Sequence, residues 1–214
     1  MADGESSSLS QTLQRANVEL MIAYDSTVDA FARALELREG EPIGHTRQVT
    51  EITVSLARAM GVNIPDQPHI RRGALLHDIG KLAVPESILK KAGPLTDQEW
   101  VIMRTHPLHS YDLLSTIVFL HQAIDIPYCH HERWDGSGYP QGLQKDQIPL
   151  AARIFAVVDV WDALTSDRPH RRAWPESQAA DYLREQASRQ FDPAVVSTFL
   201  NGKLRRKVTR PLVK

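Results

Sequence analysis

The sequence predicts an all-α protein, and three observations support this fold class. Apolar residues recur at spacings of three, four and seven along most of the 214 residues, which is the period of amphipathic helices. No segment sustains the alternation of apolar and polar residues that marks a half-buried strand. No segment has the pattern of a buried parallel strand. Because a chain of this length can bury a sizeable core, we expect one helical domain.

The composition narrows the class of protein. The apolar fraction of 42% is ordinary for a globular domain, and the formal net charge of −1 indicates no nucleic acid polymer as a partner. The single cysteine, Cys129, excludes an internal disulfide and fits a reducing compartment. No apolar run approaches the roughly 18–20 residues of a membrane span, and the polar start of the chain does not resemble a signal peptide. We therefore expect a cytoplasmic protein with no membrane span.

The N-terminal region is expected to be a disordered start over residues 1–8, followed by a helix over residues 9–39. The apolar stripe of this helix consists of Leu13, Leu20, Tyr24, Val28, Phe31 and Leu35. Two interpretations have similar weight: the helix packs along its own domain, or it is a connector that pairs with a second copy in a homodimer. The homodimer has equal weight because the stripe is longer than a typical globular helix needs.

Shorter helices are expected in the next part of the chain. They are predicted over residues 45–60, 69–80, 97–104, 109–120 and 123–131. Gly61 is a plausible stop for the first of them, since glycine is common directly after a helix. Thr96 and Glu99 have the spacing of a capping box at the start of the third.

The C-terminal part begins with a loop over residues 133–147, rich in glycine, aspartate and proline. The segment 149–165 is apolar on nearly every side, so we expect it to be the central buried helix. An amphipathic helix over residues 176–189 follows, and Asp192 and Pro193 start a short helix that ends near residue 200. Residues 203–214 form a basic tail that we expect to be solvated.

Five of the nine histidines fall into four short clusters, and an acidic residue, Asp159, lies inside an apolar segment. The histidines are His45, His77, His106, His130 and His131. Single buried histidines usually have a structural role, but a folded domain rarely buries so many histidines and a bare aspartate without partners. Imidazole and carboxylate are ligands that suit iron, manganese, zinc and nickel. A centre with several metal ions would satisfy these side chains together.

The spaced motifs resemble the HD-GYP domain, a branch of the HD-type metal-dependent phosphohydrolases. The resemblance covers about residue 30 to about residue 200, and its motifs are His77-Asp78-Ile79-Gly80-Lys81, the segment from His130 to Pro140, and the segment from Asp159 to Pro169. The His-Asp pair alone is a weak signal, whereas the spaced set is specific. The resemblance implies an HD-domain helical bundle with an N-terminal connector helix, in which residues 9–39 precede a catalytic domain over residues 40–202.

The resemblance also implies an activity and a cofactor. The expected reaction is hydrolysis of the bacterial second messenger cyclic di-GMP to linear pGpG, GMP or both, with two or three divalent ions, most often iron or manganese. By position, the implied ligands are His45, His77, Asp78, His106, His130, His131 and Asp159. Glu41 lies four residues before the first of these, where relatives with a third metal have a glutamate. Its alternative interpretation is a plain acid in a charged loop.

Individual roles follow from this implied chemistry. Asp78 would bridge two ions that share a hydroxide, and the hydroxide would attack the scissile phosphorus. Lys81 lies four residues after His77, which places it on the same face of the expected helix, where it would stabilise charge on the phosphoryl group. Arg168 and Arg171 match the family's basic substrate-binding segment, although His170 stands where the family often has tyrosine.

The loop at Gly138-Tyr139-Pro140 has three interpretations. Tyr139 contacts the substrate, the loop docks a protein partner, or the loop is a simple turn. The loop follows two implied ligands, His130 and His131, directly. This favours substrate contact or partner docking over a simple turn.

Two further functions remain open at this level. The chain could be a binding module that senses cyclic di-GMP or docks a partner with little turnover, or a phosphohydrolase that acts on another cyclic dinucleotide. All implied ligand positions are filled, which favours an enzyme, but metal ions contact the phosphate and not the base. Family members usually carry a sensory or receiver domain before the catalytic one, so the chain is expected to be either the catalytic part of a longer protein or a stand-alone form.

Overall fold

A computed structural model describes residues 2–40, 44–167 and 171–202 of the chain. Within these ranges the regular structure is helical, apart from one isolated β-bridge between Ala187 and Phe191. This confirms the all-α fold class. None of the helices in the described ranges is long and apolar enough to cross a membrane.

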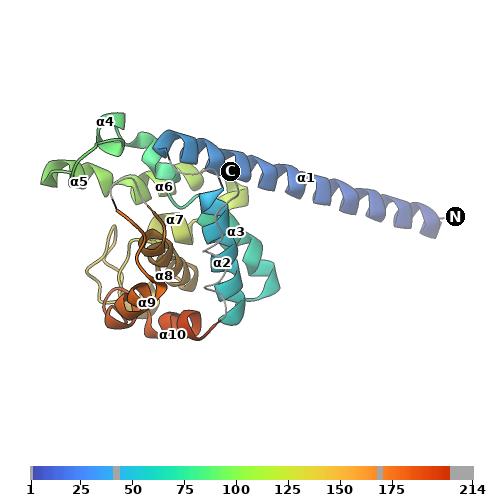
Figure 1. Cartoon of the computed structure of the whole chain (residues 1–214). Coiled ribbons are helices and arrows are strands. Elements are labelled where there is room, and N and C mark those ends of the chain that lie inside the picture. The colour runs from blue at the N-terminus through green and yellow to red at the C-terminus, as the bar shows by residue number, and fades with distance from the viewer. Residues whose placement is uncertain (1, 41–43, 168–170, 203–214) are drawn as a thin grey trace.

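Helix α1 (Ala2–Glu39) extends far beyond the rest of the molecule (Figure 1). It begins at Ala2, so residues 2–8 are helical and not the disordered start that the sequence suggested. Its apolar stripe is only partly buried, and Phe31 in its C-terminal part is 54% exposed. Val28 and Leu35 are buried against the domain, whereas Leu13 and Leu20 remain 58% and 50% exposed. The C-terminal part of the helix therefore packs along its own domain at Val28 and Leu35, as one interpretation expected, whereas pairing with a second copy stays a prediction.

Helices α2 (His45–Ala59) and α3 (Gln67–Leu75) pack against each other, and α2 also packs against α8 (Leu150–Thr165). The stop predicted after α2 is confirmed. Gly61 has a φ of +83°, and its N–H donates to the carbonyl of Arg58 at 3.1 Å while the N–H of Val62 donates to that of Ala57 at 3.0 Å. This is the Schellman arrangement, in which a residue with positive φ closes the helix.

Helix α8 is the central buried helix that its apolar sequence predicted. Phe155 and Trp161 are fully buried on it, and the ring of Trp161 meets Phe199 edge to face at 5.3 Å. Helices α9 (Glu176–Glu185) and α10 (Pro193–Asn201) pack against α8 (Figure 1). The side chain of Asp192 caps α10 as expected, accepting the N–H of Ala194 at 2.8 Å.

The middle of the chain is more irregular than the sequence suggested. The remaining elements there are η1 (Ile64–Asp66), η2 (Ile79–Ala83), α4 (Glu86–Leu89), α5 (Asp97–Met103), α6 (His106–Leu114), η3 (Val118–Ala123), α7 (Asp125–Cys129) and η4 (Lys145–Gln147). The capping box of Thr96 and Glu99 at the start of α5 is confirmed. The prediction of continuous helices over residues 69–80 and 109–120 is wrong. Each is an α-helix followed by a short 3-10 helix, because contacts between segments distant in sequence override the local pattern.

Gly80 allows η2 to approach α6 closely. A Cβ atom at this position would lie 1.9 Å from the carbonyl oxygen of His106 and 2.6 Å from the backbone nitrogen of Ser110. The N–H of Gly80 donates to the Ser110 hydroxyl at 2.9 Å. This contact brings Lys81, the next residue, to the start of the helix that carries His106.

We therefore expect the Gly80→Ala variant to be destabilised, because a methyl group would force η2 and α6 apart. Overpacking of this kind typically lowers the free energy of unfolding by about 1–3 kcal/mol. Gly93→Ala is the matched control, since a Cβ there has nothing within 4 Å. Urea denaturation of both variants would check this. Equal stability of the two variants would contradict the close approach.

Candidate metal centre

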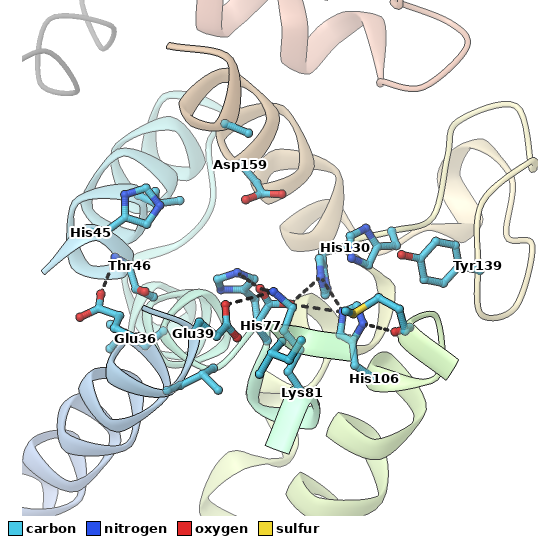
Figure 2. Close-up of a pocket in the computed structure, with 18 of the residues that line it drawn as sticks. Glu36, Glu39, His45, Thr46, His77, Lys81, His106, His130, Tyr139 and Asp159 are labelled. Atoms are coloured by element: carbon cyan, nitrogen blue, oxygen red, sulfur yellow. Dashed lines mark hydrogen bonds and ion pairs between the residues drawn. The ribbon is translucent and has the colours of Figure 1, made fainter. Parts of the chain in front are cut away.

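A cavity of about 480 Å³ lies where the ends of several helices meet (Figure 2). All seven ligands implied by the sequence motifs line it, together with Lys81, Tyr139 and two acids of α1, Glu36 and Glu39. The eighth candidate ligand, Glu41, lies outside the described residues, as do Arg168 and His170.

The fold delivers most of these side chains from helix ends. His45 is the first residue of α2 and His106 is the first residue of α6. His77 and Asp78 lie in the turn between α3 and η2, and His130 directly follows α7. Asp159 is the exception, because it projects from the middle of α8 toward the cavity (Figure 2).

Four side chains come close enough to share one ion. The ligand atoms of Asp78, His106, His130 and His131 all lie within 4.8 Å of one another. Oδ1 of Asp78 lies 3.3 Å from Nε2 of His106 and 3.7 Å from Nε2 of His130. Among the described residues this buried oxygen has no hydrogen-bond partner. A buried carboxylate oxygen without a donor, surrounded by imidazoles, fits a cation better than it fits an empty cavity.

Backbone carbonyls fix the orientation of three of the histidine rings. Nδ1 of His106 lies 2.8 Å from the carbonyl of Met103, and Nδ1 of His130 lies 3.0 Å from that of Ile126. Nδ1 of His77 lies 2.9 Å from the carbonyl of Ala74. Because a carbonyl only accepts, Nδ1 carries the proton in each ring. In the neutral ring, Nε2 then presents its lone pair to the cavity, which is the usual arrangement for metal-binding histidines.

The other implied ligands lie outside the four-residue cluster. Nε2 of His77 is 3.0 Å from Oδ2 of Asp78. Nε2 of His45 is 3.2 Å from Oδ2 of Asp162, a buried acid for which the sequence suggested no role. Asp159 lines the cavity with them. The structure thus places all seven side chains around one cavity but brings only four of them within reach of a single ion.

The electrostatics of the centre favour positive charge beside Asp78. Burial opposes ionisation of this carboxyl group, but His77 and Lys81 hold its pKa well below the ordinary value. Burial would lower the pKa of His77, yet the Asp78 carboxylate outweighs this and raises it to about 9. A protonated imidazole and an ammonium group therefore compensate the carboxylate. A divalent ion would take over this compensation and displace the proton from His77.

The pKa values of His130 and His131 shift in the opposite direction from that of His77. Burial lowers the pKa of His130, and burial together with the neighbouring His130 lowers that of His131 well below its ordinary value. Both rings are therefore neutral at neutral pH, which is the form that binds metal. The donor set, the free oxygen and the neutral rings together fit a divalent metal ion.

Lys81 faces the cavity, although it lies in η2 and not on the helix that the sequence predicted. Its Nζ is 2.7 Å from Oδ2 of Asp78 and 3.2 Å from Oε2 of Glu39. Burial opposes the charge on Lys81, but the two carboxylates raise its pKa above the ordinary value. Lys81 therefore carries a fixed positive charge at the edge of the centre.

The expected substrate contacts have different positions. Tyr139 lines the cavity, and its ring stacks on His131 with centroids 4.8 Å apart and planes inclined by 24°. The guanidinium of Arg104 lies 5.5 Å from the centre of the same ring. Arg171 instead donates to the carbonyl of Ala163 and is not among the described residues that line the cavity. Its contact with substrate stays a prediction.

A second cavity of about 560 Å³ adjoins the cluster. His130, His131, Tyr139 and Asp159 line both cavities. The second cavity adds two cationic side chains, Arg104 and Arg133, and the Nε atom of Arg133 is buried without a hydrogen-bond partner among the described residues. The metal centre thus has a basic region beside it.

Glu132 anchors the loop that carries Tyr139, a role that the sequence did not reveal. Its side chain is buried and accepts the N–H groups of Gln141 at 2.7 Å and Leu143 at 3.0 Å. Gly138 packs directly on this segment, since a Cβ there would lie 2.5 Å from Cα of Glu132. The only signal in the sequence was the position of Glu132 directly after His131 and before a glycine-rich loop.

We expect Glu132→Ala to destabilise the protein, because two backbone N–H groups would lose their acceptor. Each such loss typically costs about 1–3 kcal/mol of stability when the group is buried. Asp135→Ala is the control in the same loop, because Asp135 bonds to Ser137 on the exposed surface. The free energies of unfolding in urea would be compared. A loss for Glu132→Ala no larger than for the control would refute the anchoring role.

Comparison with known protein families gives a match to the HD domain over residues 29–195. This covers most of the chain and includes every ligand in the cavity. The chain belongs to the HD domain family, and the resemblance stated from the sequence motifs is confirmed.

Several curated proteins and solved structures are similar to the chain. The cyclic di-GMP phosphodiesterase response regulator RpfG of Xanthomonas campestris is 40% identical over 92% of this chain and 52% of its own length. The 3'3'-cGAMP-specific phosphodiesterase 2 of Vibrio cholerae is 38% identical over 86% of this chain and 36% of its own length. Bd1817, an HDG"Y"P protein from Bdellovibrio bacteriovorus, has the same fold with a TM-score of 0.60 and 21% identity, over 74% of this chain and 52% of that structure. The chain thus spans about half or less of the length of these proteins.

Proposed function

We propose that the chain is a metal-dependent phosphodiesterase that hydrolyses a cyclic dinucleotide, with cyclic di-GMP as the first candidate and linear pGpG, GMP or both as products. The observation that carries the proposal is the free Oδ1 of Asp78 among His106, His130 and His131, beside the charged Lys81. The names of the similar proteins support the same reaction class. The motifs favour cyclic di-GMP among the candidate substrates.

The donor set suits iron or manganese, since imidazole and carboxylate bind both. Seven donors exceed what one ion needs, so we propose two or three ions, with Glu41 as a ligand of the third. Bound divalent ions would supply Lewis acidity toward the phosphodiester and lower the pKa of water.

The side chains of the chain would hold and orient the reacting groups. Asp78 would draw cations to the centre of the cavity, and the neutral rings of His130 and His131 would complete their coordination. Lys81 would donate to a non-bridging oxygen of the phosphodiester, because Asp78 and Glu39 hold its ammonium group charged at the cavity wall.

A cyclic dinucleotide has two phosphates, so the binding site must accommodate both halves of the substrate. We propose that the phosphodiester under attack occupies the cavity at Asp78 and that the other half extends toward Arg104 and Arg133 in the second cavity. Tyr139 lines both cavities and would contact the substrate between them. Arg168 and Arg171 remain proposed substrate contacts.

The base at one position distinguishes cyclic di-GMP from 3'3'-cGAMP, and similar proteins are named for each substrate at 40% and 38% identity. The metal centre contacts phosphate and therefore does not select between them. Both substrates belong in the test.

We expect protein purified without oxygen and loaded with iron or manganese to hydrolyse cyclic di-GMP, and Asp78→Ala to reduce the rate by at least about 100-fold. Removal of an outer-shell partner already costs about 10–100-fold in affinity or activity, and Asp78 lies at the centre of the cluster. Asp181→Ala is the control, because Asp181 is an exposed acid on α9 that pairs with Arg184 at 2.6 Å. Products would be separated by chromatography.

The outcomes separate the alternatives. Metal binding without turnover of either dinucleotide would favour a module that senses cyclic di-GMP or docks a partner. Faster turnover of 3'3'-cGAMP would replace cyclic di-GMP as the proposed substrate. Failure of the folded protein to bind any metal would refute the proposal.

We also propose that the exposed part of α1 pairs with a second copy of the chain. Leu9, Leu13 and Leu20 are 63%, 58% and 50% exposed on it, and an apolar helix surface of this kind favours association. The loop at Gly138-Tyr139-Pro140 remains a proposed docking site for a protein partner. We propose a cytoplasmic location because the suggested substrate is a second messenger.

Light scattering should give a mass twice the 24.1 kDa of one chain at micromolar concentration. Leu20→Glu should lower the mass to that of one chain, because it places a charge in the paired apolar surface. Gln11→Glu adds the same charge to the same exposed segment but outside the apolar stripe, and should leave the dimer intact. A single-chain mass for the unmodified protein would rule out this dimer.

A further inference from the structure

The last turns of α1 are tied to the metal centre by a buried acid. Glu36 is 4% exposed, and its two carboxylate oxygens accept the backbone N–H groups of Gly44 and Thr46, each at 2.8 Å. These two residues flank His45, the first residue of α2. Figure 2 shows Glu36 bonded to the start of the helix that carries His45.

Helix α2 lacks a side-chain cap of its own. Its N-cap residue is Gly44, which has a φ of +90° and no side chain that could accept the first N–H groups. These N–H groups have no partners within the helix and need an external acceptor. A carboxylate is a favourable acceptor there, because the start of a helix carries partial positive charge. Glu36 supplies this cap from a different helix.

Two neighbouring residues of α1, Arg38 and Glu39, contact the segment that carries Lys81. Arg38 donates to the carbonyls of Leu82 at 3.1 Å and Val84 at 3.0 Å. Glu39 pairs with Lys81 at 3.2 Å. The end of α1 therefore contacts both the segment that carries His45 and the segment that carries Lys81.

We infer that Glu36 is a positioning residue for the metal centre. By fixing the first turn of α2, it holds the His45 ring at the cavity, where Nε2 now lies 3.2 Å from Asp162. Metal affinity therefore depends on the two hydrogen bonds from the start of α2 to Glu36. This inference rests on the proposed metal site, and it adds a residue outside the ligand set.

The test measures the affinity of the intact chain for Mn²⁺ by competition with a fluorescent chelator, alongside thermal melting. Glu36→Ala removes both acceptors and should lower the affinity by about 10–100-fold, as for other residues that orient a ligand. Glu36→Gln keeps one acceptor and should have an intermediate affinity. The control is Asp25→Asn, which breaks another contact of α1, the ion pair with the buried Arg72 at 2.7 Å, but does not line the cavity. It should retain the affinity of the unmodified protein.

A double-mutant cycle with His45→Ala distinguishes positioning from general stabilisation. If Glu36 acts through His45, the double variant Glu36→Ala/His45→Ala should bind Mn²⁺ as His45→Ala does, because the two changes remove the same interaction. Additive losses of affinity would overturn the inference. Equal Mn²⁺ affinities of Glu36→Ala and Asp25→Asn would also overturn the inference.

The cycle is repeated with Glu36→Gln if Glu36→Ala does not fold, so that the inference stays testable. If the unmodified protein binds no Mn²⁺, the proposed function fails together with the inference. If it binds Mn²⁺ and changes at Glu36 do not alter the affinity, only the inference fails.

Discussion

The buried carboxylate of Asp78 is the constraint on which the rest of the centre depends. A charge in this position is unfavourable unless cations and donors surround it. Oδ2 has such partners in His77 at 3.0 Å and Lys81 at 2.7 Å, whereas Oδ1 has no hydrogen-bond partner among the described residues. The rings of His106 and His130 turn Nε2 toward this oxygen, at 3.3 Å and 3.7 Å. A cation bound among them would complete the arrangement.

The fold meets this constraint by ending helices at the cavity. Helix ends bring the histidines together from segments far apart in sequence, and close packing keeps them in place. Gly80 lets η2 touch α6, Glu132 ties the loop of Tyr139 to the turn that carries His131, and α8 closes the cavity with Asp159. The stability of the packing and the geometry of the centre are therefore linked.

Much of the fold could be predicted from the sequence because its signals are local. The apolar helix α8, the capping box at Thr96 and the stop at Gly61 each depend on neighbouring residues alone. The clustering of the ligands followed from spaced motifs. The helix boundaries around His77 and His106 could not be predicted in this way, because packing between η2 and α6 determines them. Glu39 contacts a residue 42 positions away, and Glu36 caps a helix other than its own, so no local pattern reveals either role.

We expect the side chains around Asp78 to hold metal ions. Anomalous X-ray diffraction from crystals of protein loaded with manganese tests it most directly. We expect at least two anomalous peaks inside the cavity, one of them at bonding distance from Oδ1 of Asp78 and from the ring nitrogens beside it. Anomalous peaks only outside the cavity, or none in a folded protein, would contradict it.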